Sequence, residues 1–229
     1  MLDAGQDNGV DLTGGYYDAG DNVKFNFPAA FSITLLAWSG VEFAEGYKKA
    51  GQWKYLLEAV KWGTDYFIKC HTKKDELYAQ VGNGGIDHGY WYPPEYINYK
   101  YPSYKVDASS PGTEVAAETA AALAAASIMF KSEDSSYSAT LLKHAIEIYD
   151  FADTYRGDYT TSVPASGFYN SYSGYLDELV WGAAWLLKAT GDEIYREKFD
   201  AIAEAEYGEQ DSKRYDRVTE PISWDDKRP

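Results

Sequence analysis

From Thr113 to Phe130 the chain reads TEVAAETAAALAAASIMF. Eight of these residues are alanine. Alanine has the best intrinsic helix propensity, and its small side chain lets neighbouring backbones approach closely. The stretch therefore predicts a helix with other helices packed tightly against it.

Apolar residues at helical spacing predict five further helices around this one. Their expected ranges are 29–49, 52–70, 136–155, 175–189 and 192–206. Short links join the six helices into three helical hairpins, so we predict an all-α fold with long loops between the hairpins. Residues 71–111 are rich in glycine, tyrosine and proline and are predicted to form one of these loops. We find no convincing series of strands.

The 229 residues suffice for one domain or for part of a larger one, and we treat residues 1–229 as a single unit. Lys and Arg number 21 against 36 Asp and Glu, which gives a formal net charge of −15. This charge argues against nucleic acid or an anionic membrane as a partner. No uninterrupted apolar stretch approaches the roughly 20 residues that span a bilayer. A polar run follows Met1, so an export signal would have to lie outside this chain.

The cysteine and histidine content limits the metal and redox chemistry that we expect. Cys70 is the only cysteine, which excludes a disulfide within the chain and a multi-cysteine metal site. His71, His88 and His144 are widely separated in sequence, and we therefore expect no metal site built from histidines.

Aromatic residues are unusually abundant, with 7 Trp, 22 Tyr and 9 Phe. Tyrosine suits a surface that is apolar on one side and wet at its edge, as in a cleft that binds sugar rings. A fold that packs many tyrosines in its interior has the same composition, and composition does not separate the two.

A glycine-rich loop from Gly14 to Phe25 carries two carboxylates, Asp18 and Asp21, just before the first predicted helix. A tight turn around Gly20 can point both side chains at one water, which one of them holds while the other removes its proton. Alternatively, both aspartates bond to backbone N–H groups in an Asx turn. The loop on its own favours this second interpretation.

Several motifs together resemble glycoside hydrolase family 9 cellulases. They are DLTGGYYDAGD (11–21), IDHGYW (86–91), PSYKVD (102–107), PGTEVAAET (111–119), FYNS (168–171) and SGYLDELVWG (173–182). They occur in the family's order over nearly the whole chain. The resemblance implies an (α/α)6 barrel, of which three hairpins are about half, and an endo-β-1,4-glucanase that hydrolyses cellulose or related β-glucans with inversion.

The resemblance also implies roles for individual residues. Asp21 corresponds to the catalytic base, and Asp18 helps to hold the water. Substrate-binding positions correspond to Tyr17, His88, Trp91 and Tyr169. Without the resemblance, His88 reads as an ordinary loop histidine, and Trp91 and Tyr169 read as core residues.

A calcium site is implied for the segment before the fifth helix. The corresponding ligands are Ser173, Gly174, Asp177, Glu178 and Asp226. Their oxygen atoms form the hard donor set that Ca²⁺ prefers. The alternative is that Ser173 caps the helix while the two acidic residues oppose its dipole.

The family's catalytic domain is about twice as long as this chain, and its general-acid glutamate lies in the second half. We therefore expect no general acid here, because Glu114 and Glu118 offer no reason for that role. We also expect the open barrel face to self-associate or to pair with a separate C-terminal half.

A polymeric substrate implies a secreted, extracellular protein. The alternative function is a β-glucan-binding or inactive half-barrel without turnover.

Overall fold

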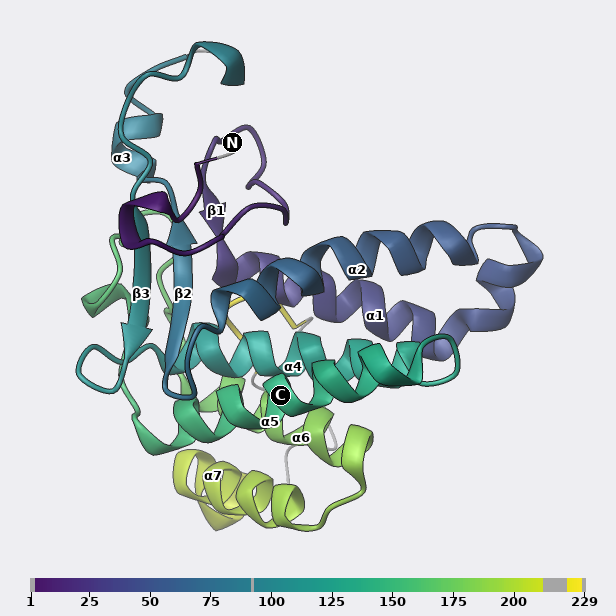
Figure 1. The fold of residues 1–229 in the computed structure, drawn as a ribbon. Coiled ribbons are helices and arrows are strands. Elements are labelled where there is room, and N and C mark those ends of the chain that lie inside the picture. The colour runs from purple at the N-terminus through teal and green to yellow at the C-terminus, as the bar shows by residue number, and fades with distance from the viewer. Residues whose placement is uncertain (1–2, 92, 212–221, 228–229) are drawn as a thin grey trace.

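The computed structural model describes residues 3–91, 93–211 and 222–227, with only the backbone described for residues 206–211. Seven helices are present in this part of the chain: α1 (Asn26–Lys49), α2 (Trp53–Cys70), α3 (Gly84–Asp87), α4 (Thr113–Phe130), α5 (Ser135–Thr154), α6 (Leu176–Thr190) and α7 (Ile194–Asp211). The three predicted hairpins are α1–α2, α4–α5 and α6–α7, and they stack one after another (Figure 1). The helical fold class is confirmed, and the short α3 is additional.

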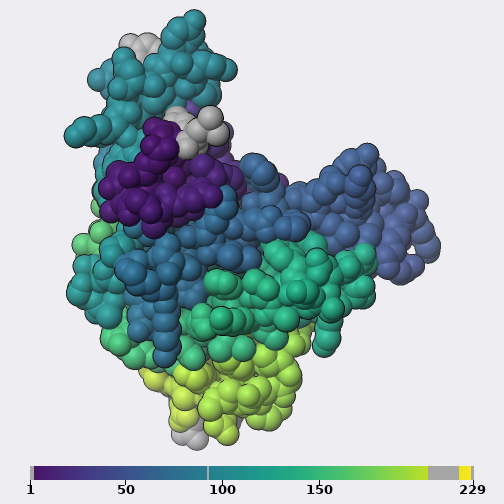
Figure 2. Space-filling view, viewed as in Figure 1, coloured from purple at the N-terminus to yellow at the C-terminus, as the bar shows by residue number. Residues whose placement is uncertain are grey.

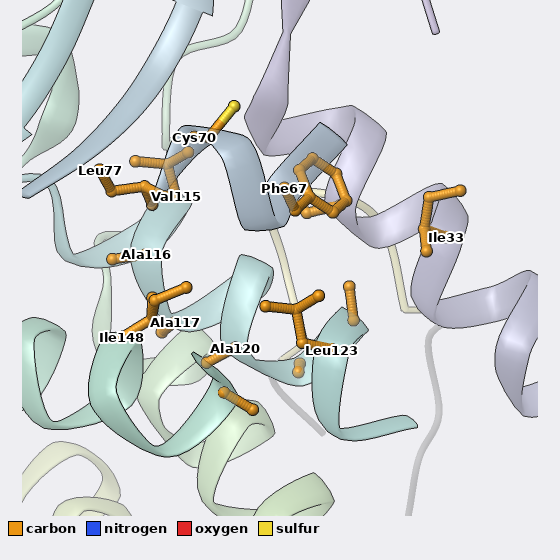
Figure 3. Close-up of a cluster of buried hydrophobic side chains, with 14 of the residues drawn as sticks. Ile33, Phe67, Cys70, Leu77, Val115, Ala116, Ala117, Ala120, Leu123 and Ile148 are labelled. Atoms are coloured by element: carbon orange, nitrogen blue, oxygen red, sulfur yellow. The ribbon is translucent and has the colours of Figure 1, made fainter. Parts of the chain in front are cut away.

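Helix α4 is the centre of the molecule. It packs against α5, α1 and α6, and every residue in it except Ile128 is buried. Its alanines allow this close approach, because they fill little of the space between helices. Figure 3 shows Ala116, Ala117 and Ala120 among larger side chains from α1, α2 and α5.

A small antiparallel sheet lies at one end of the hairpins, where the sequence predicts only a loop (Figure 1). It consists of β1 (Lys24–Phe25), β2 (Glu76–Val81) and β3 (Ser103–Asp107), in the order β1-β2-β3. Lys24 pairs with Val81, and Leu77 pairs with Val106. The prediction of an uninterrupted loop over 71–111 is therefore wrong. All six residues of β2 are buried, so its two faces do not alternate in polarity as an exposed strand would.

Two helices are long and apolar enough to cross a membrane when judged by length and composition alone, α1 and α4. This differs from the expectation that no such stretch exists. In α4, 94% of the apolar window is buried inside the protein, and in α1 the share is 39%. Burial in the hairpin stack accounts for the composition of α4. The α1–α2 hairpin projects beyond the rest of the molecule (Figure 2).

Candidate active site

The loop before β1 holds Asp18 and Asp21 on a tight turn. The backbone N–H of Asp21 donates to the carbonyl of Asp18 over 2.7 Å, and the N–H of Asp18 donates to the carbonyl of Val23 over 2.9 Å. The residue with left-handed backbone geometry is Ala19, at φ 30°, and not Gly20. A non-glycine residue in this region is strained, and such strain concentrates at functional sites.

Asp18 binds a tyrosine from a distant loop. The hydroxyl of Tyr169 donates to Asp18 Oδ2 over 2.6 Å, although 151 residues separate them in sequence. Burial raises the pKa of Asp18, and the negative charge of Asp21 raises it further, while the bond from Tyr169 and the nearness of His88 oppose this rise. The Asp18 carboxyl is thus held by a protein hydrogen bond through its Oδ2 atom.

Asp21 contacts the histidine that the sequence singled out. His88 Nε2 lies 2.7 Å from Asp21 Oδ1. His88 directly follows α3, and the side chain of Asn83 caps the start of that helix by accepting from the N–H of Ile86. The described partners of the two carboxylates are side chains from other segments, Tyr169 and His88, and this arrangement favours the shared-water interpretation over an Asx turn.

Three residues that the sequence analysis did not single out fix the position of the turn. Asp87 is buried and accepts from the backbone N–H of Asn22 over 3.2 Å and from the Asn22 amide over 3.1 Å. Tyr99 donates a short hydrogen bond to the same carboxylate. These bonds tie the aspartate turn to α3. In the sequence, the sign that Asn22 and Asp87 belong to the site is that each is next to a predicted site residue: Asn22 follows Asp21, and Asp87 precedes His88.

The turn separates two hollows on the surface. One has a volume of about 580 Å³ and is lined by Gly20, Asp21, Asn22, Asp87, His88, Tyr90, Trp91 and Pro93. The other is about 380 Å³, and Tyr16, Tyr17, Asp18, Phe25 and Leu36 are among its lining residues. The two carboxylates thus lie at the boundary between two aromatic-lined hollows.

Of the aromatic residues predicted to bind substrate, two are exposed and one packs against other rings. Trp91 is 96% exposed and Tyr17 is 39% exposed, so neither is a core residue. Tyr169 is half-buried and packs on Phe25 and Trp224, with ring centroids 5.0 and 5.1 Å apart. This packing holds the Tyr169 hydroxyl in place against Asp18. An exposed indole can stack on the C–H face of a sugar ring.

The predicted calcium ligands lie together around the start of α6. The hydroxyl of Ser173 donates to Asp177 over 3.2 Å and to the carbonyl of Asp225. Gly174 has φ 89°, a conformation that favours glycine. The helix N-cap is Tyr175, and no side chain caps it, so Ser173 does not play the alternative capping role. Glu178 is fully buried, and its Oε2 has no hydrogen-bond partner among the described residues, which fits a cation at this position.

A lysine from the C-terminal segment enters the same region. Lys227 Nζ lies 2.8 Å from Glu118 Oε2 and 3.0 Å from Glu178 Oε1, and its backbone N–H donates to Asp177. Burial alone would lower the pKa of Lys227, but the carboxylates of Glu118 and Glu178 raise it, so the amine stays charged. The sequence analysis did not single out Lys227.

Glu114 and Glu118 are both buried in α4 and line neither hollow. Glu114 accepts from the backbone N–H of Tyr159 over 2.9 Å, and burial raises its pKa to about 8. Glu118 accepts from the indole N–H of Trp181 over 3.1 Å. Both carboxyl groups are thus engaged in contacts inside the helical stack.

Helical hairpins that carry paired carboxylates beside exposed aromatic rings are the arrangement expected of an all-α glycoside hydrolase. The chain belongs to glycosyl hydrolase family 9, whose sequence model matches residues 1–229. It is 52% identical to Endoglucanase B of Cellulomonas fimi over 231 residues, which cover 99% of this chain and 22% of that protein. It is 52% identical to Endoglucanase 7 of Oryza sativa over 85% of this chain and 37% of that protein.

Solved structures show the same relationship in three dimensions. An endoglucanase from the termite Nasutitermes takasagoensis matches with a TM-score of 0.89 and 49% identity, over 96% of this chain and 49% of that one. The cellulase Cel9M of C. cellulolyticum, solved with cellobiose, matches with a TM-score of 0.88 and 37% identity, over 97% and 50%. The described hairpins therefore correspond to about half of the (α/α)6 barrel of these enzymes.

Proposed function

We propose that this chain is the N-terminal part of an inverting endo-β-1,4-glucanase that acts on cellulose or a related β-glucan. The observation that carries the proposal is the turn that places Asp18 and Asp21 between two aromatic-lined hollows. The family relationship and the cellobiose bound to the related Cel9M enzyme support the same substrate class. Because the substrate is an insoluble polymer, we propose an extracellular site of action.

In this proposal Asp21 is the base that deprotonates the attacking water, and Asp18 holds that water. An inverting glycosidase needs such a carboxylate on one face of the sugar and a carboxylic acid on the other. His88 contacts Asp21 directly, so it orients the base and is placed to bond a sugar hydroxyl. Tyr169 orients Asp18 through its hydroxyl.

The exposed rings supply the binding surface for the sugar chain. Trp91 and Tyr90 line the hollow beside Asp21, while Tyr17 lines the one beside Asp18. A glucan lying across the turn would contact both, which places a glycosidic bond over the two carboxylates. Stacking on these rings gives affinity without contributing to bond cleavage.

Besides Asp18 and Asp21, the described carboxyl that lines the two hollows is Asp87. It accepts hydrogen bonds from Asn22 and Tyr99, so we do not assign it as the acid that protonates the leaving oxygen. We propose that this acid lies in another part of the complete enzyme. That part would also cover the exposed apolar side chains of α1, among which Leu35 and Phe43 line a hollow of about 620 Å³. Self-association through the same face is the alternative pairing.

We propose that Ca²⁺ binds at Ser173, Gly174, Asp177, Glu178 and Asp226. The support is the oxygen-rich donor set and the unpartnered Oε2 of Glu178. Asp226 lies in the described segment 222–227, whose Asp225 carbonyl meets Ser173. The ion would join this segment to the start of α6 and stabilise the loop that carries Tyr169.

The alternative function is glucan binding without turnover, favoured by the exposed Trp91 and by the lack of an assigned general acid in the described hollows. Hydrolysis of carboxymethylcellulose, with and without Ca²⁺, and binding of cello-oligosaccharides separate the two. Because the proposed general acid lies outside this chain, the enzyme proposal expects the chain to release reducing ends slowly, about 10²–10⁴-fold below an enzyme that has its acid. This release should be faster with Ca²⁺, and Trp91→Ala should weaken binding. Unchanged binding in Trp91→Ala would contradict both functions, and binding without any release would favour the alternative.

A further inference from the structure

Two histidines that are 73 residues apart in sequence meet at the end of α2. His71 caps the carboxyl end of that helix, and His144 lies on α5. Their Nδ1 atoms are 2.8 Å apart, and their rings are nearly perpendicular, at 78°. Folding therefore brings His71 and His144 together, and their separation in sequence does not exclude a metal site built from histidines.

A carboxylate completes this cluster. Glu147 follows His144 by three positions on α5, which places both side chains on one face of the helix. One ligand atom from each of His71, His144 and Glu147 lies within 4.8 Å of the others. The Glu147 carboxylate is 3.9 Å from Lys143 Nζ, which is too long for a hydrogen bond.

The ring of His71 is already oriented as a metal ligand. Its Nε2 lies 3.4 Å from the carbonyl of Lys74, which can only accept. The tautomer with its proton on Nε2 would therefore point that proton at the carbonyl and leave the Nδ1 lone pair facing His144. Metal-bound histidines usually donate their second ring N–H to a carbonyl in this way. Burial lowers the pKa of both imidazoles, which favours the neutral form that binds metal.

The spacing is close to that of ligands around one ion. Two nitrogens at tetrahedral positions around Zn²⁺ lie about 3.3 Å apart, given Zn–N distances of about 2.0–2.1 Å. The two Nδ1 atoms of His71 and His144, now 2.8 Å apart, would have to move apart by about half an ångström to reach that value. Without an ion, the same distance requires a hydrogen bond from one imidazole to the other.

We propose that His71, His144 and Glu147 bind one Zn²⁺ ion or a similar divalent transition metal, with water as the fourth ligand. Two imidazoles and one carboxylate suit Zn²⁺ better than Ca²⁺, which prefers oxygen atoms alone. None of the three residues lines the hollows beside Asp18 and Asp21. The ion would link the end of α2 to the middle of α5, independently of the proposed glucanase site.

Calorimetric titration of the chelator-treated full chain with ZnCl2, in millimolar Ca²⁺, tests this site. We expect one Zn²⁺ per chain and a rise of at least about 5 °C in the unfolding midpoint at a hundredfold excess over Kd. Co²⁺ in place of Zn²⁺ should give the visible absorption of a tetrahedral ion. No binding, or no rise in the midpoint, would overturn the proposal.

The variants His144→Gln and Glu147→Gln should each weaken Zn²⁺ binding at least about tenfold, because losing even an outer partner of a metal ligand costs that much. The matched control is His88→Ala, because His88 forms a second such cluster with Asp21 and Asp87. Binding should survive in His88→Ala. If His88→Ala abolishes binding while His144→Gln and Glu147→Gln, both confirmed as folded by circular dichroism, do not, the ion binds elsewhere and the proposal is wrong.

Discussion

Asp18 and Asp21 lie in different surroundings, although only two residues separate them. Asp18 is held by a tyrosine hydroxyl, and burial raises its pKa. Asp21 is paired with a half-exposed histidine. One carboxylate is therefore bonded to a tyrosine, and the other is bonded to a histidine that lines the hollow beside Trp91. This asymmetry supports the assignment of Asp18 to holding the water and of Asp21 to removing its proton.

The bond from Tyr169 can be removed without changing the shape of the site. In Tyr169→Phe, Asp18 loses a hydrogen bond that favours its charged form, so its pKa should rise. If ionised Asp18 is needed to hold the water, the acidic limb of the pH–activity profile should move to higher pH. The profile of kcat/KM against pH measures this shift. A shift to lower pH would contradict the role of Tyr169.

The sequence predicted Asp18, Asp21, His88 and Tyr169 because they fall in motifs that resemble a known family, and the structure brings these four residues together. It did not predict Asp87, whose role is to hold the turn by accepting bonds from Asn22 and Tyr99. Such contacts join segments that are far apart in the chain, so local spacing does not reveal them.

At the scale of the elements, alanine content and helical period located the hairpins well, because these signals are local. The helix predicted at 52–70 begins one residue later, at Trp53, and ends at Cys70 as expected. The sheet was missed because β1 has two residues and β2 is buried on both faces. Neither strand shows the alternation of polar and apolar residues by which strands are recognised.

The close contact between α4 and α6 depends on Gly182. A Cβ atom at this position would lie 2.9 Å from Tyr149 Cδ2 and 3.2 Å from the carbonyl oxygen of Ala117. We expect Gly182→Ala to lower the free energy of unfolding by about 1–3 kcal/mol through overpacking. Urea unfolding measures the change.

The matched control is Gly46→Ala on α1, where no heavy atom lies within 4 Å of the added Cβ. It should raise the free energy of unfolding by about 0.5–1 kcal/mol, since alanine favours the helix. Equal effects of the two substitutions would contradict the packing of α6 on α4 described above.

At the scale of the whole molecule, the segment 222–227 packs against the helical hairpins and contacts Tyr169. Trp224 packs on Phe27 and Tyr169, and Lys227 pairs with two buried glutamates on α4 and α6. The segment thus connects the central helix, the proposed calcium ligands and the tyrosine that orients Asp18. The family resemblance placed Asp226 with Ser173 and Asp177, but it did not predict the pairing of Lys227 with Glu118 and Glu178, because that pairing joins three distant segments.

Removing the buried cation tests this connection. Lys227→Met leaves Glu118 and Glu178 without their counter-charge, which should lower the free energy of unfolding by about 3–5 kcal/mol. Lys54→Met is the matched control, because Lys54 and Glu58 form an exposed pair at 3.6 Å. The control should cost less than about 1 kcal/mol. A similarly small effect of Lys227→Met in urea unfolding would show that the buried pairing does not hold the segment.

The most direct test of the account uses 2,4-dinitrophenyl β-cellobioside, whose leaving group departs without help from a general acid. The chain should hydrolyse it and release α-cellobiose first, as proton NMR can observe. Asp21→Asn should slow this reaction at least about 10²-fold, while the exposed Asp150→Asn on α5 should leave it unchanged. Equal rates for the wild-type chain and Asp21→Asn, or β-cellobiose as the first product, would contradict the assignment of Asp21 as the base of an inverting enzyme.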